Sequence, residues 1–335
     1  MKINKEPLFF EYVSSFLDLY LNKQISRSHN TIESYRDALT VFRRYILNEK
    51  KLTIQKFTMS MCNKKLLLDY MDFLKSNKYK ATTINHHITA IRSYVYYVSD
   101  IDVSYQGIAI SLGHIPLLRE TKEERPYLSQ EALKAMFEAP TGSKAVRDRT
   151  ILILLYETAI RVSELIHICL DDLFLNNENP HILINGKGDK ERIVGISNKA
   201  LEHLKYYIQI YHGEKIKTNI LFYSLIKDKY GYLSPSTIEM FIQKYADKVR
   251  KNGIDIPIKV YPHMFRRSRA THLYQDDIPL ELVSRILGHS SIETTKIYAK
   301  PSIKQLRLII ENENDVNIEP EWNNEDEIAK LFGIR

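Results

Sequence analysis

Apolar side chains recur at helical spacing through the N-terminal third of the chain. Polar breaks such as QISRSHN and KSNKYKA separate the apolar-periodic segments. The predicted helices run from Phe9 to Leu21, Thr31 to Leu47, Lys64 to Lys75 and Thr82 to Tyr97. Thr31, and Thr82 or Thr83, stand where helix N-caps are expected. The pattern predicts a small helical bundle.

The pattern changes after this bundle. The stretch SLGHIPLLRETKEERPYLS, at 111–129, combines glycine, proline and mixed charge and is typical of a linker. Further on, PHILINGKGDKERIVGIS has two short β-branched runs around the glycine-rich turn Asn185 to Lys190, which indicates a β-hairpin. Helices are predicted on either side of the hairpin, over 130–138, 148–168, 199–211, 236–251, 262–275 and 280–287.

These elements predict a mainly α fold with a small β-hairpin or sheet. A chain of 335 residues is too long for one core, so two domains are expected. The predicted boundaries are a helical domain over 1–110, a linker over 111–127, an α+β domain over 128–310, and an acidic tether with a C-terminal helix over 311–335. The last helix, Glu325 to Phe332, would carry Ile328, Leu331 and Phe332 on one face.

Membrane and disulfide-rich classes do not fit this composition. No apolar run approaches the roughly 20 residues that span a bilayer, and the N-terminus lacks a secretory apolar region. We therefore expect a cytoplasmic protein without membrane contact. The two cysteines, Cys62 and Cys169, stand singly in apolar helical contexts, so they predict core residues rather than a disulfide or a cysteine-based zinc site.

The distribution of charge points to a polyanionic partner. Residues 311–335 hold eight acidic and two basic side chains, a formal charge of −6, so the rest of the chain carries +13 and the total is +7. A basic body attracts nucleic acid, because phosphate contacts supply much of the binding free energy. Basic solvated faces are also common, so the charge alone favours nucleic acid only slightly.

Several residues could take part in catalysis or binding, although each also has an ordinary structural explanation. Arg161 and Glu164 are three apart on a predicted helix and share a face, which alone favours a local ion pair. His263 and Arg266 share a face of another helix, where a basic surface cluster is the plain interpretation. Lys187 lies between two glycines at the hairpin tip, where lysines are usually solvated. The GKGDK stretch lacks the P-loop spacing, so nucleotide binding is not predicted.

The order and spacing of these residues along the chain are more specific than any one of the residues alone. The chain has Arg-x-x-Glu, then Gly-Lys-Gly in a hairpin, His-x-x-Arg, Gly-His, and a tyrosine nine residues after the last histidine. This arrangement resembles the tyrosine recombinase or phage-integrase family over nearly all of Leu128 to Lys300. The N-terminal bundle resembles the family's SAM-like core-binding domain, with lower specificity. The residues that carry the likeness are Arg161, Glu164, Lys187, His263, Arg266, Gly288, His289 and Tyr298.

The resemblance implies an enzyme that cleaves and rejoins DNA strands. Tyr298 would attack a phosphodiester and form a 3′-phosphotyrosyl intermediate, which keeps the bond energy and makes ATP unnecessary. Arg161 and Arg266 would stabilise the charge on the non-bridging oxygens. Lys187 would protonate the leaving 5′-oxygen, His263 would exchange the tyrosine proton, and His289 would bond the phosphate.

The same resemblance implies the supporting residue and the partners. Glu164 would orient the arginine and histidine around it. No metal and no other cofactor would be needed, because the arginines do the electrostatic work. The partner would be double-stranded DNA with specific recombination sites, bound by a homotetramer. Candidate DNA contacts, apart from the catalytic groups, are Arg36, Arg43, Arg44, His86, Arg92 and Arg267.

Two sequence boxes depart from the family pattern. Many members read T-G-x-R where this chain has Thr158-Ala159-Ile160-Arg161, and H-x-L-R-H where it has His263-Met264-Phe265-Arg266-Arg267. Neither change removes a catalytic group. Arg267 in place of a histidine leaves its role open, and a phosphate contact is one option.

Other functions remain open at this stage. A type IB topoisomerase uses similar residues but acts as a monomer, and the spacing from Gly288 to Tyr298 argues against it. A DNA-binding protein without catalysis, or a structural helical protein with a basic face, would have no need for the full set. For the biological role, the extra C-terminal segment and the divergent boxes favour a mobile-element integrase. The alternative is an Xer-type enzyme that resolves chromosome dimers.

Overall fold

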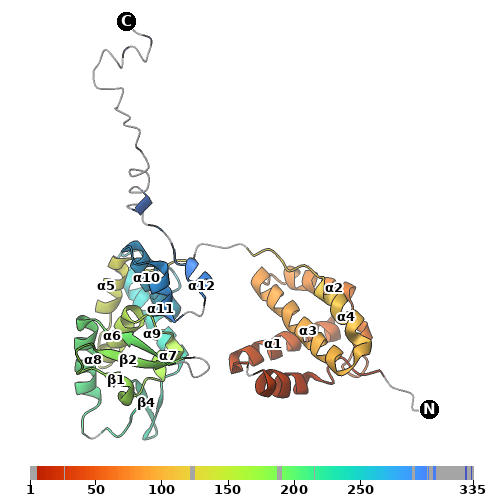
Figure 1. Ribbon diagram of the computed structural model, residues 1–335, viewed down its shortest axis with the longest axis horizontal. Coiled ribbons are helices and arrows are strands. Elements are labelled where there is room, and N and C mark those ends of the chain that lie inside the picture. The colour runs from red at the N-terminus through yellow and green to blue at the C-terminus, as the bar shows by residue number, and fades with distance from the viewer. Residues whose placement is uncertain are drawn as a thin grey trace. The chain divides into compact units, whose positions relative to one another are not determined.

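The computed structural model describes residues 6–25, 27–120, 125–186, 191–214, 216–288, 291–299, 301, 305–306, 329 and 333. It divides into two compact units, Met1–Glu124 and Arg125–Arg335 (Figure 1). The expected C-terminal helix, Glu325 to Phe332, lies outside the described residues except for Ala329. Beyond Tyr298 the structure describes Leu306, which is 47% exposed.

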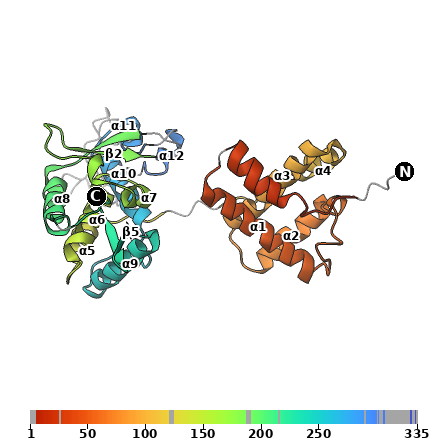
Figure 2. The same cartoon turned by 90° about the horizontal axis from the view of Figure 1, so that it is seen from below.

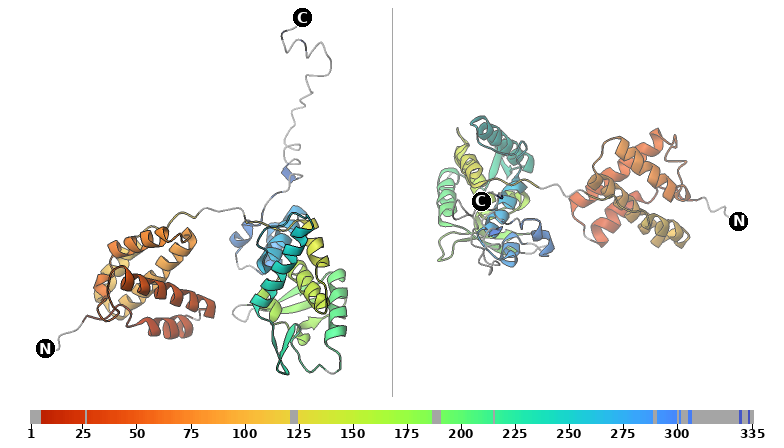
Figure 3. Two further views of the ribbon diagram at one scale, coloured as in Figure 1. Left: turned by 180° about the vertical axis from the view of Figure 1, so that it is seen from behind. Right: turned by 90° about the horizontal axis from the view of Figure 1, so that it is seen from above.

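The N-terminal unit is a bundle of helices, drawn from red to yellow in Figure 3. Helices α1 and α3 pack side by side, and α4 packs on α3. The elements are the π-helical segment η1 (Ser15–Gln24), α1 (His29–Asn48), α2 (Lys64–Ser76), α3 (Ala81–Ile101) and α4 (Gln106–Gly113), with 3₁₀ turns η2 (Met59–Met61) and η3 (Val103–Tyr105).

Aromatic rings fill the core of this unit. Phe9 makes edge contacts with Phe42 and Tyr94, and Phe42 makes another with Tyr70. All four rings are 0% exposed. Edge-to-face pairs add about 0.5–1.5 kcal/mol each beyond the burial of their area. Cys62 is buried in the same core, as expected.

Three local expectations for this unit were wrong. The first helix begins at Ser15 rather than Phe9, because Leu8 forms a β-bridge with Thr58 and the Phe9 N–H donates to the Phe57 carbonyl. Ser28 and Lys80 hold the N-cap positions expected for the threonines.

The third error concerns the expected linker, whose first residues, 111–113, belong to α4. Gly113 is present there because the backbone runs close to a ring: a Cβ at this position would lie 2.6 Å from the Tyr96 hydroxyl oxygen.

The C-terminal unit surrounds helix α6 (Ala145–Glu157) with further helices and two small sheets (Figures 1 and 2). Helices α8 and α10 pack on α6, whose Ile151, Leu152, Leu154 and Leu155 are 0% exposed. The other helices are α5 (Gln130–Glu138), α7 (Val162–Ile166), α8 (Asn198–Tyr211), α9 (Pro235–Lys251), α10 (Pro262–Gln275), α11 (Leu280–Leu287) and α12 (Glu293–Lys296), with the 3₁₀ turn η4 (Leu170–Asp172).

The predicted hairpin is confirmed and is part of a three-stranded antiparallel sheet. Its strands are β2 (His181–Asn185) and β3 (Glu191–Gly195), with β1 (Leu173–Phe174) on the other side of β2. A second hairpin, β4 (Tyr223–Ile226) and β5 (Lys229–Tyr232), was not predicted. Cys169 is half-buried beside this region, not in the core.

The helix predicted over Asp148 to Ile168 is interrupted. Helix α6 ends at Glu157, and α7 starts at Val162. Between them Ala159 has φ +50°, in the left-handed region that costs an alanine about 1–2 kcal/mol relative to glycine. The glycine of the family's T-G-x-R pattern therefore suits this conformation, and the chain tolerates alanine at a cost. The methyl group is 0% exposed and packs in a small apolar cluster.

We predict that Ala159→Gly changes the free energy of unfolding by less than about 1 kcal/mol. Relief of the left-handed strain, about 1–2 kcal/mol, offsets the loss of one buried methyl, about 0.8 kcal/mol, and the entropic cost of glycine, about 0.5–1 kcal/mol. The matched control is Ala270→Gly, since Ala270 is 0% exposed in the same cluster but lies within α10. It should cost about 1–2 kcal/mol. Urea unfolding of the two variants measures the difference, and equal losses would contradict the strain.

Candidate functional site

Helix α10 carries two of the predicted residues. Pro262 at its first turn and the extended N-cap residue Tyr261 start the helix and place His263 in the first turn, with Arg266 one turn later. Arg266 is only 1% exposed, so a basic surface cluster is the wrong description. Its Nη1 donates to the Ala159 carbonyl and its Nη2 to the Leu287 carbonyl, both at 2.6 Å. The guanidinium thereby ties the end of α6 to the end of α11.

Arg161 and Glu164 meet, but not as neighbours on one face of a long helix. Arg161 is the N-cap residue of α7, and Glu164 is its third residue. The Glu164 Oε2 accepts from the Arg161 backbone N–H at 2.8 Å, and Oε1 accepts from Arg161 Nη1 at 2.8 Å. The carboxylate therefore closes the first turn of α7 and also holds the arginine side chain, which stays 43% exposed.

A further arginine completes this cluster. Arg192, on β3, donates from Nη1 to Glu164 Oε1 at 3.0 Å and from Nη2 to Oε2 at 2.8 Å. The Glu164 side chain is only 6% exposed. Burial alone would raise the pKa of Glu164, but hydrogen bonds and charge from Arg192 and Arg161 outweigh it and lower the pKa to about 2. The carboxylate therefore stays ionised at every pH at which the protein would act.

Tyr298 lies in a small cluster separate from the main core. Its side chain is 2% exposed and belongs to a cluster with Ala159, Ala270, Val283 and Leu287. Its hydroxyl oxygen is 3.5 Å from His263 Nε2, a long contact of the kind that tightens when substrate binds. The short helix α12 ends at Lys296, two residues before Tyr298, and Ser291 Oγ accepts from the Glu293 N–H at its start.

The environment of His263 is strongly cationic. Its ring has an exposed face, yet the surrounding protein keeps water from much of it. This desolvation, with the positive charges of four arginines, lowers the pKa of His263 to about 4. In order of effect the charges belong to Arg266, Arg267, Arg161 and Arg125. A neutral imidazole at pH 7 can accept the proton of a phenol.

Two predicted catalytic residues, Lys187 and His289, lie outside the described residues. Their sequence neighbours are placed. Strand β3, which follows Lys187 along the chain, carries Arg192, and Gly288 ends α11 directly before His289. Gly288 has φ +63°, a conformation for which glycine is the residue of choice.

The structure does not place Arg267 as a DNA contact. Arg267 is 4% exposed, and its Nη1 donates to the Pro126 carbonyl at 2.9 Å. It therefore fastens the start of the C-terminal unit to α10. This contact with Pro126 gives the guanidinium a structural role, and a phosphate contact of Arg267 stays a prediction.

The candidate DNA contacts in the N-terminal unit differ in exposure. Arg43 and Arg44 are exposed on α1. Arg36 is shared between Asp18 and Glu33. On α3, His86 is half-buried near the Ser34 carbonyl, and Arg92 is half-buried with its Nη2 on the Ile115 carbonyl. Arg43 and Arg44 are therefore the better candidates, and their role stays a prediction.

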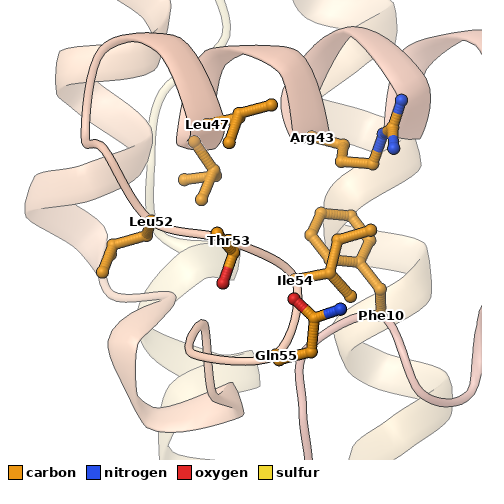
Figure 4. A pocket seen from close by; sticks show the side chains of 8 residues that line it. Phe10, Arg43, Leu47, Leu52, Thr53, Ile54 and Gln55 are labelled. Carbon is orange, nitrogen blue, oxygen red and sulfur yellow. The ribbon is translucent and has the colours of Figure 1, made fainter.

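A small pocket in the N-terminal unit is unrelated to this chemistry. It has a volume of about 190 Å³, and Figure 4 shows Leu47, Leu52, Ile54 and Phe10 around it, with Arg43 at one side. Its lining includes no histidine, tyrosine or carboxylate, so we do not consider it an active site. Within the described part of the chain, no cluster of three or more histidine, cysteine or acidic side chains could hold a metal. Nor does any helix described there have the length and apolar character needed to cross a membrane.

Comparison with known proteins gives the family. Residues 126–305 match the model of the phage integrase family, and residues 13–99 match the phage integrase N-terminal SAM-like domain. The chain belongs to the phage integrase family. This confirms the resemblance and the fold class, a mainly helical protein with small antiparallel sheets.

Relatives in this family are named tyrosine recombinases. The chain is 30% identical over 291 residues to tyrosine recombinase XerC of Staphylococcus carnosus (strain TM300), covering 85% of this chain and 91% of the relative. It is 31% identical over 287 residues to XerD of Staphylococcus aureus (strain N315), covering 84% and 90%.

Solved structures share the fold. XerH recombinase bound to palindromic difH substrate has a TM-score of 0.67 at 22% identity, covering 89% of this chain and 83% of that one. The Tn1549 transposon integrase in complex with transposon right end DNA has a TM-score of 0.68 at 17% identity, covering 90% and 98%. A lambda integrase tetramer bound to a Holliday junction has a TM-score of 0.67 at 14% identity, covering 89% and 78%.

Arg192 is not among the residues that the sequence motifs predict for the site. In the sequence it is only a basic residue just after the predicted hairpin turn, in KERIV, and the side chain of such a residue is usually solvated. Its contact with Glu164 depends on how the hairpin packs against α7, which a spacing rule along the chain does not contain.

We predict that the imidazole of His263 in the free protein titrates near pH 4 rather than near 6.5, because burial and the arginines disfavour its charged form. Arg267→Gln removes one of these charges and should move the titration upward, toward 6.5. Histidine-selective NMR of the two proteins measures both values. An unchanged titration in the variant would show that the Arg267 charge does not act on the ring.

Proposed function

We propose that this chain is a site-specific DNA recombinase that cuts and rejoins strands through a covalent bond between Tyr298 and a 3′-phosphate. One observation carries the proposal: the Tyr298 hydroxyl lies 3.5 Å from His263 Nε2, and the buried Arg266 is close enough to interact electrostatically with both side chains. The charge of Arg161 also acts on Arg266 and disfavours its protonated form, whereas Tyr298 favours it. A nucleophile, a base and two cations thus converge in one place.

The reaction exchanges one phosphate ester for another. The Tyr298 oxygen bonds to phosphorus while the bond from phosphorus to the 5′-oxygen breaks. His263 Nε2 takes the phenolic proton, and the 5′-oxygen takes a proton from Lys187 to leave as a hydroxyl. Rejoining runs the same steps backward, with the 5′-hydroxyl as nucleophile. The number of phosphate ester bonds is unchanged, so the exchange needs no ATP.

The two arginines suit the charge that develops on the phosphate. Arg266 is fixed by two backbone carbonyls and Arg161 by Glu164, so neither has to reorganise during the reaction. Burial, with the charge of Arg161, lowers the pKa of Arg266 to about 10, which still leaves it protonated at neutral pH. Its buried Nε has no hydrogen-bond partner among the described residues. We assign this N–H to an oxygen of the bound phosphate.

The partner we propose is duplex DNA with a specific recombination site. The net charge of +7, concentrated outside the acidic C-terminal residues, favours binding to phosphates. The lambda integrase structure supports a tetramer on paired sites as the working assembly. Arg43 and Arg44 on α1 are proposed contacts of the N-terminal unit.

The biological setting has two candidates. Relatives named XerC and XerD support an Xer-type role, whereas the shared fold of the Tn1549 integrase and the departures at Ala159 and Arg267 support a mobile element. We propose the mobile element as the first to test. Sequencing DNA that is covalently trapped on the protein in cells decides: element ends support this role, and a single chromosomal site supports the Xer-type role.

We predict that Tyr298→Phe abolishes the covalent DNA adduct while folding and DNA affinity stay near those of the wild type, since one oxygen is removed from a buried ring. The measurement is adduct formation on nicked suicide DNA, followed by denaturing gels with and without protease. Tyr156→Phe is the matched control, because Tyr156 is also buried in this unit and its hydroxyl pairs with His272. The control should form the adduct normally. An adduct in the Tyr298→Phe protein would exclude Tyr298 as the nucleophile.

We also predict that Arg266→Lys slows adduct formation by about 10²–10³, the usual cost of one lost transition-state donor. A lysine keeps the positive charge in the buried site, but its single ammonium group cannot reach both the Ala159 and the Leu287 carbonyls. Single-turnover cleavage at saturating DNA measures the effect, and thermal unfolding checks that the variant is folded. Cleavage at the wild-type rate by a folded variant would remove Arg266 from the mechanism.

A further inference from the structure

Arg192 occupies a point where three elements of the C-terminal unit meet. It lies on β3 opposite Ile184 of β2, and its guanidinium bonds both oxygens of Glu164 on α7. Its side chain is 17% exposed. Paired, two-pronged contacts between arginine and carboxylate are the most directional ion pairs in proteins. Arg192 therefore fixes the orientation of β3 relative to α7.

The third element is the end of α11. A Cβ placed on Gly288 would lie 2.8 Å from Arg192 Cδ and 2.9 Å from its Nε. The Arg192 side chain thus lies directly against the glycine that precedes His289 in the sequence. The carbonyl of the preceding residue, Leu287, accepts from Arg266. A shift of Arg192 would disturb this turn as well as Glu164.

The division of Glu164 between two arginines has a consequence for Arg161. Each carboxylate oxygen accepts one bond from Arg192 and one from Arg161, counting its backbone N–H. Because Arg192 occupies both oxygens, Arg161 makes only a single side-chain bond to Glu164 among the described residues. The rest of its guanidinium, in a side chain that is 43% exposed, stays available to a phosphate.

We infer that Arg192 is a positioning residue of the strand-cleavage site. It holds Glu164 so that the Arg161 side chain faces the phosphate. It also fixes the positions of β3 and of the Gly288 turn relative to Glu164. The inference rests on the proposed function. Arg192 does not contact the reacting atoms itself. It acts through Glu164, and its effect is on the rate of cleavage rather than on DNA affinity.

The test uses full-length Arg192→Gln and Arg192→Lys, with single-turnover cleavage of suicide DNA at saturating concentration and a separate binding titration. Partners that orient the groups in contact with substrate cost about 10- to 100-fold when removed, as measured around metal ligands. Arg192→Gln should slow cleavage by about that factor, with the DNA dissociation constant changed by less than about threefold. Arg192→Lys restores the charge without the two-pronged contact, so its cleavage rate should lie between those of Arg192→Gln and the wild type.

Arg250→Gln is the matched control. Arg250 on α9 also pairs with a carboxylate, Asp247, and with the Pro257 carbonyl, but it is not bonded to any group of the site. It should cleave at the wild-type rate. Loss of cleavage in this variant equal to that of Arg192→Gln would mean that general destabilisation, not positioning, explains the loss and would overturn the inference.

A double variant shows whether Arg192 acts through the carboxylate. In a Glu164→Gln background the partner of Arg192 is already altered, so adding Arg192→Gln should slow cleavage by less than about threefold. If the cleavage defects of the two single variants multiply in the double variant, the inference is overturned. If Arg192→Gln does not fold, the lysine variant decides, because wild-type cleavage by it would show that the paired geometry is not needed. An adduct missing from the wild-type protein would instead contradict the proposed function.

Discussion

The site depends on holding several positive charges close together in a partly buried place. Arg161, Arg192 and Arg266 act electrostatically on one another, and a single carboxylate, Glu164, lies among them. Two unit charges about 4 Å apart interact by about 4 kcal/mol at an effective dielectric constant near 20, so the repulsion is substantial. Glu164 offsets part of it, and the Ala159 and Leu287 carbonyls hold Arg266 by dipoles. The remaining excess of positive charge favours a phosphate.

This constraint explains local features of the backbone. The carbonyl of Ala159 can reach Arg266 because the chain turns through a left-handed residue between α6 and α7, and that turn also places Arg161 at the N-cap of α7. At α11 the left-handed Gly288 ends the helix where the Leu287 carbonyl meets Arg266. The left-handed turns at Ala159 and Gly288 therefore place the carbonyl oxygens of Ala159 and Leu287 where the Arg266 guanidinium can donate to them.

The sequence predicted the regular helices well and the turns poorly. Helices over 130–138, 262–275 and 280–287 have the predicted bounds, because apolar periodicity and clear end signals agree there. The break at Ala159 was missed because an alanine stands where a glycine would have signalled it. The β4–β5 hairpin was missed because its turn uses Lys227 and Asp228 at positive φ, without the usual Asn-Gly.

The residues of the site could be predicted where they belong to motifs with a fixed order and spacing along the chain. The spacing identified Arg161, Glu164, His263, Arg266 and Tyr298, and the structure brings these residues together. It could not identify Arg192, whose contact with Glu164 joins residues 28 positions apart, nor the burial of Arg267. Both depend on how a hairpin and a linker pack on the helices, and packing of that kind leaves no periodic signal in the chain.

Desolvation and the cationic cluster also determine the protonation state of His263, the proposed base. A histidine near pH 7 is ordinarily divided between its two forms, but desolvation and the charges of the surrounding arginines keep His263 neutral. A neutral ring can accept the Tyr298 proton, and the positive field that keeps it neutral also stabilises the phenolate and the charged phosphate. When a phosphate binds, it offsets part of that field and raises the proton affinity of the imidazole. Under the proposed mechanism, binding of the substrate therefore strengthens the base at the moment when the tyrosine must lose its proton.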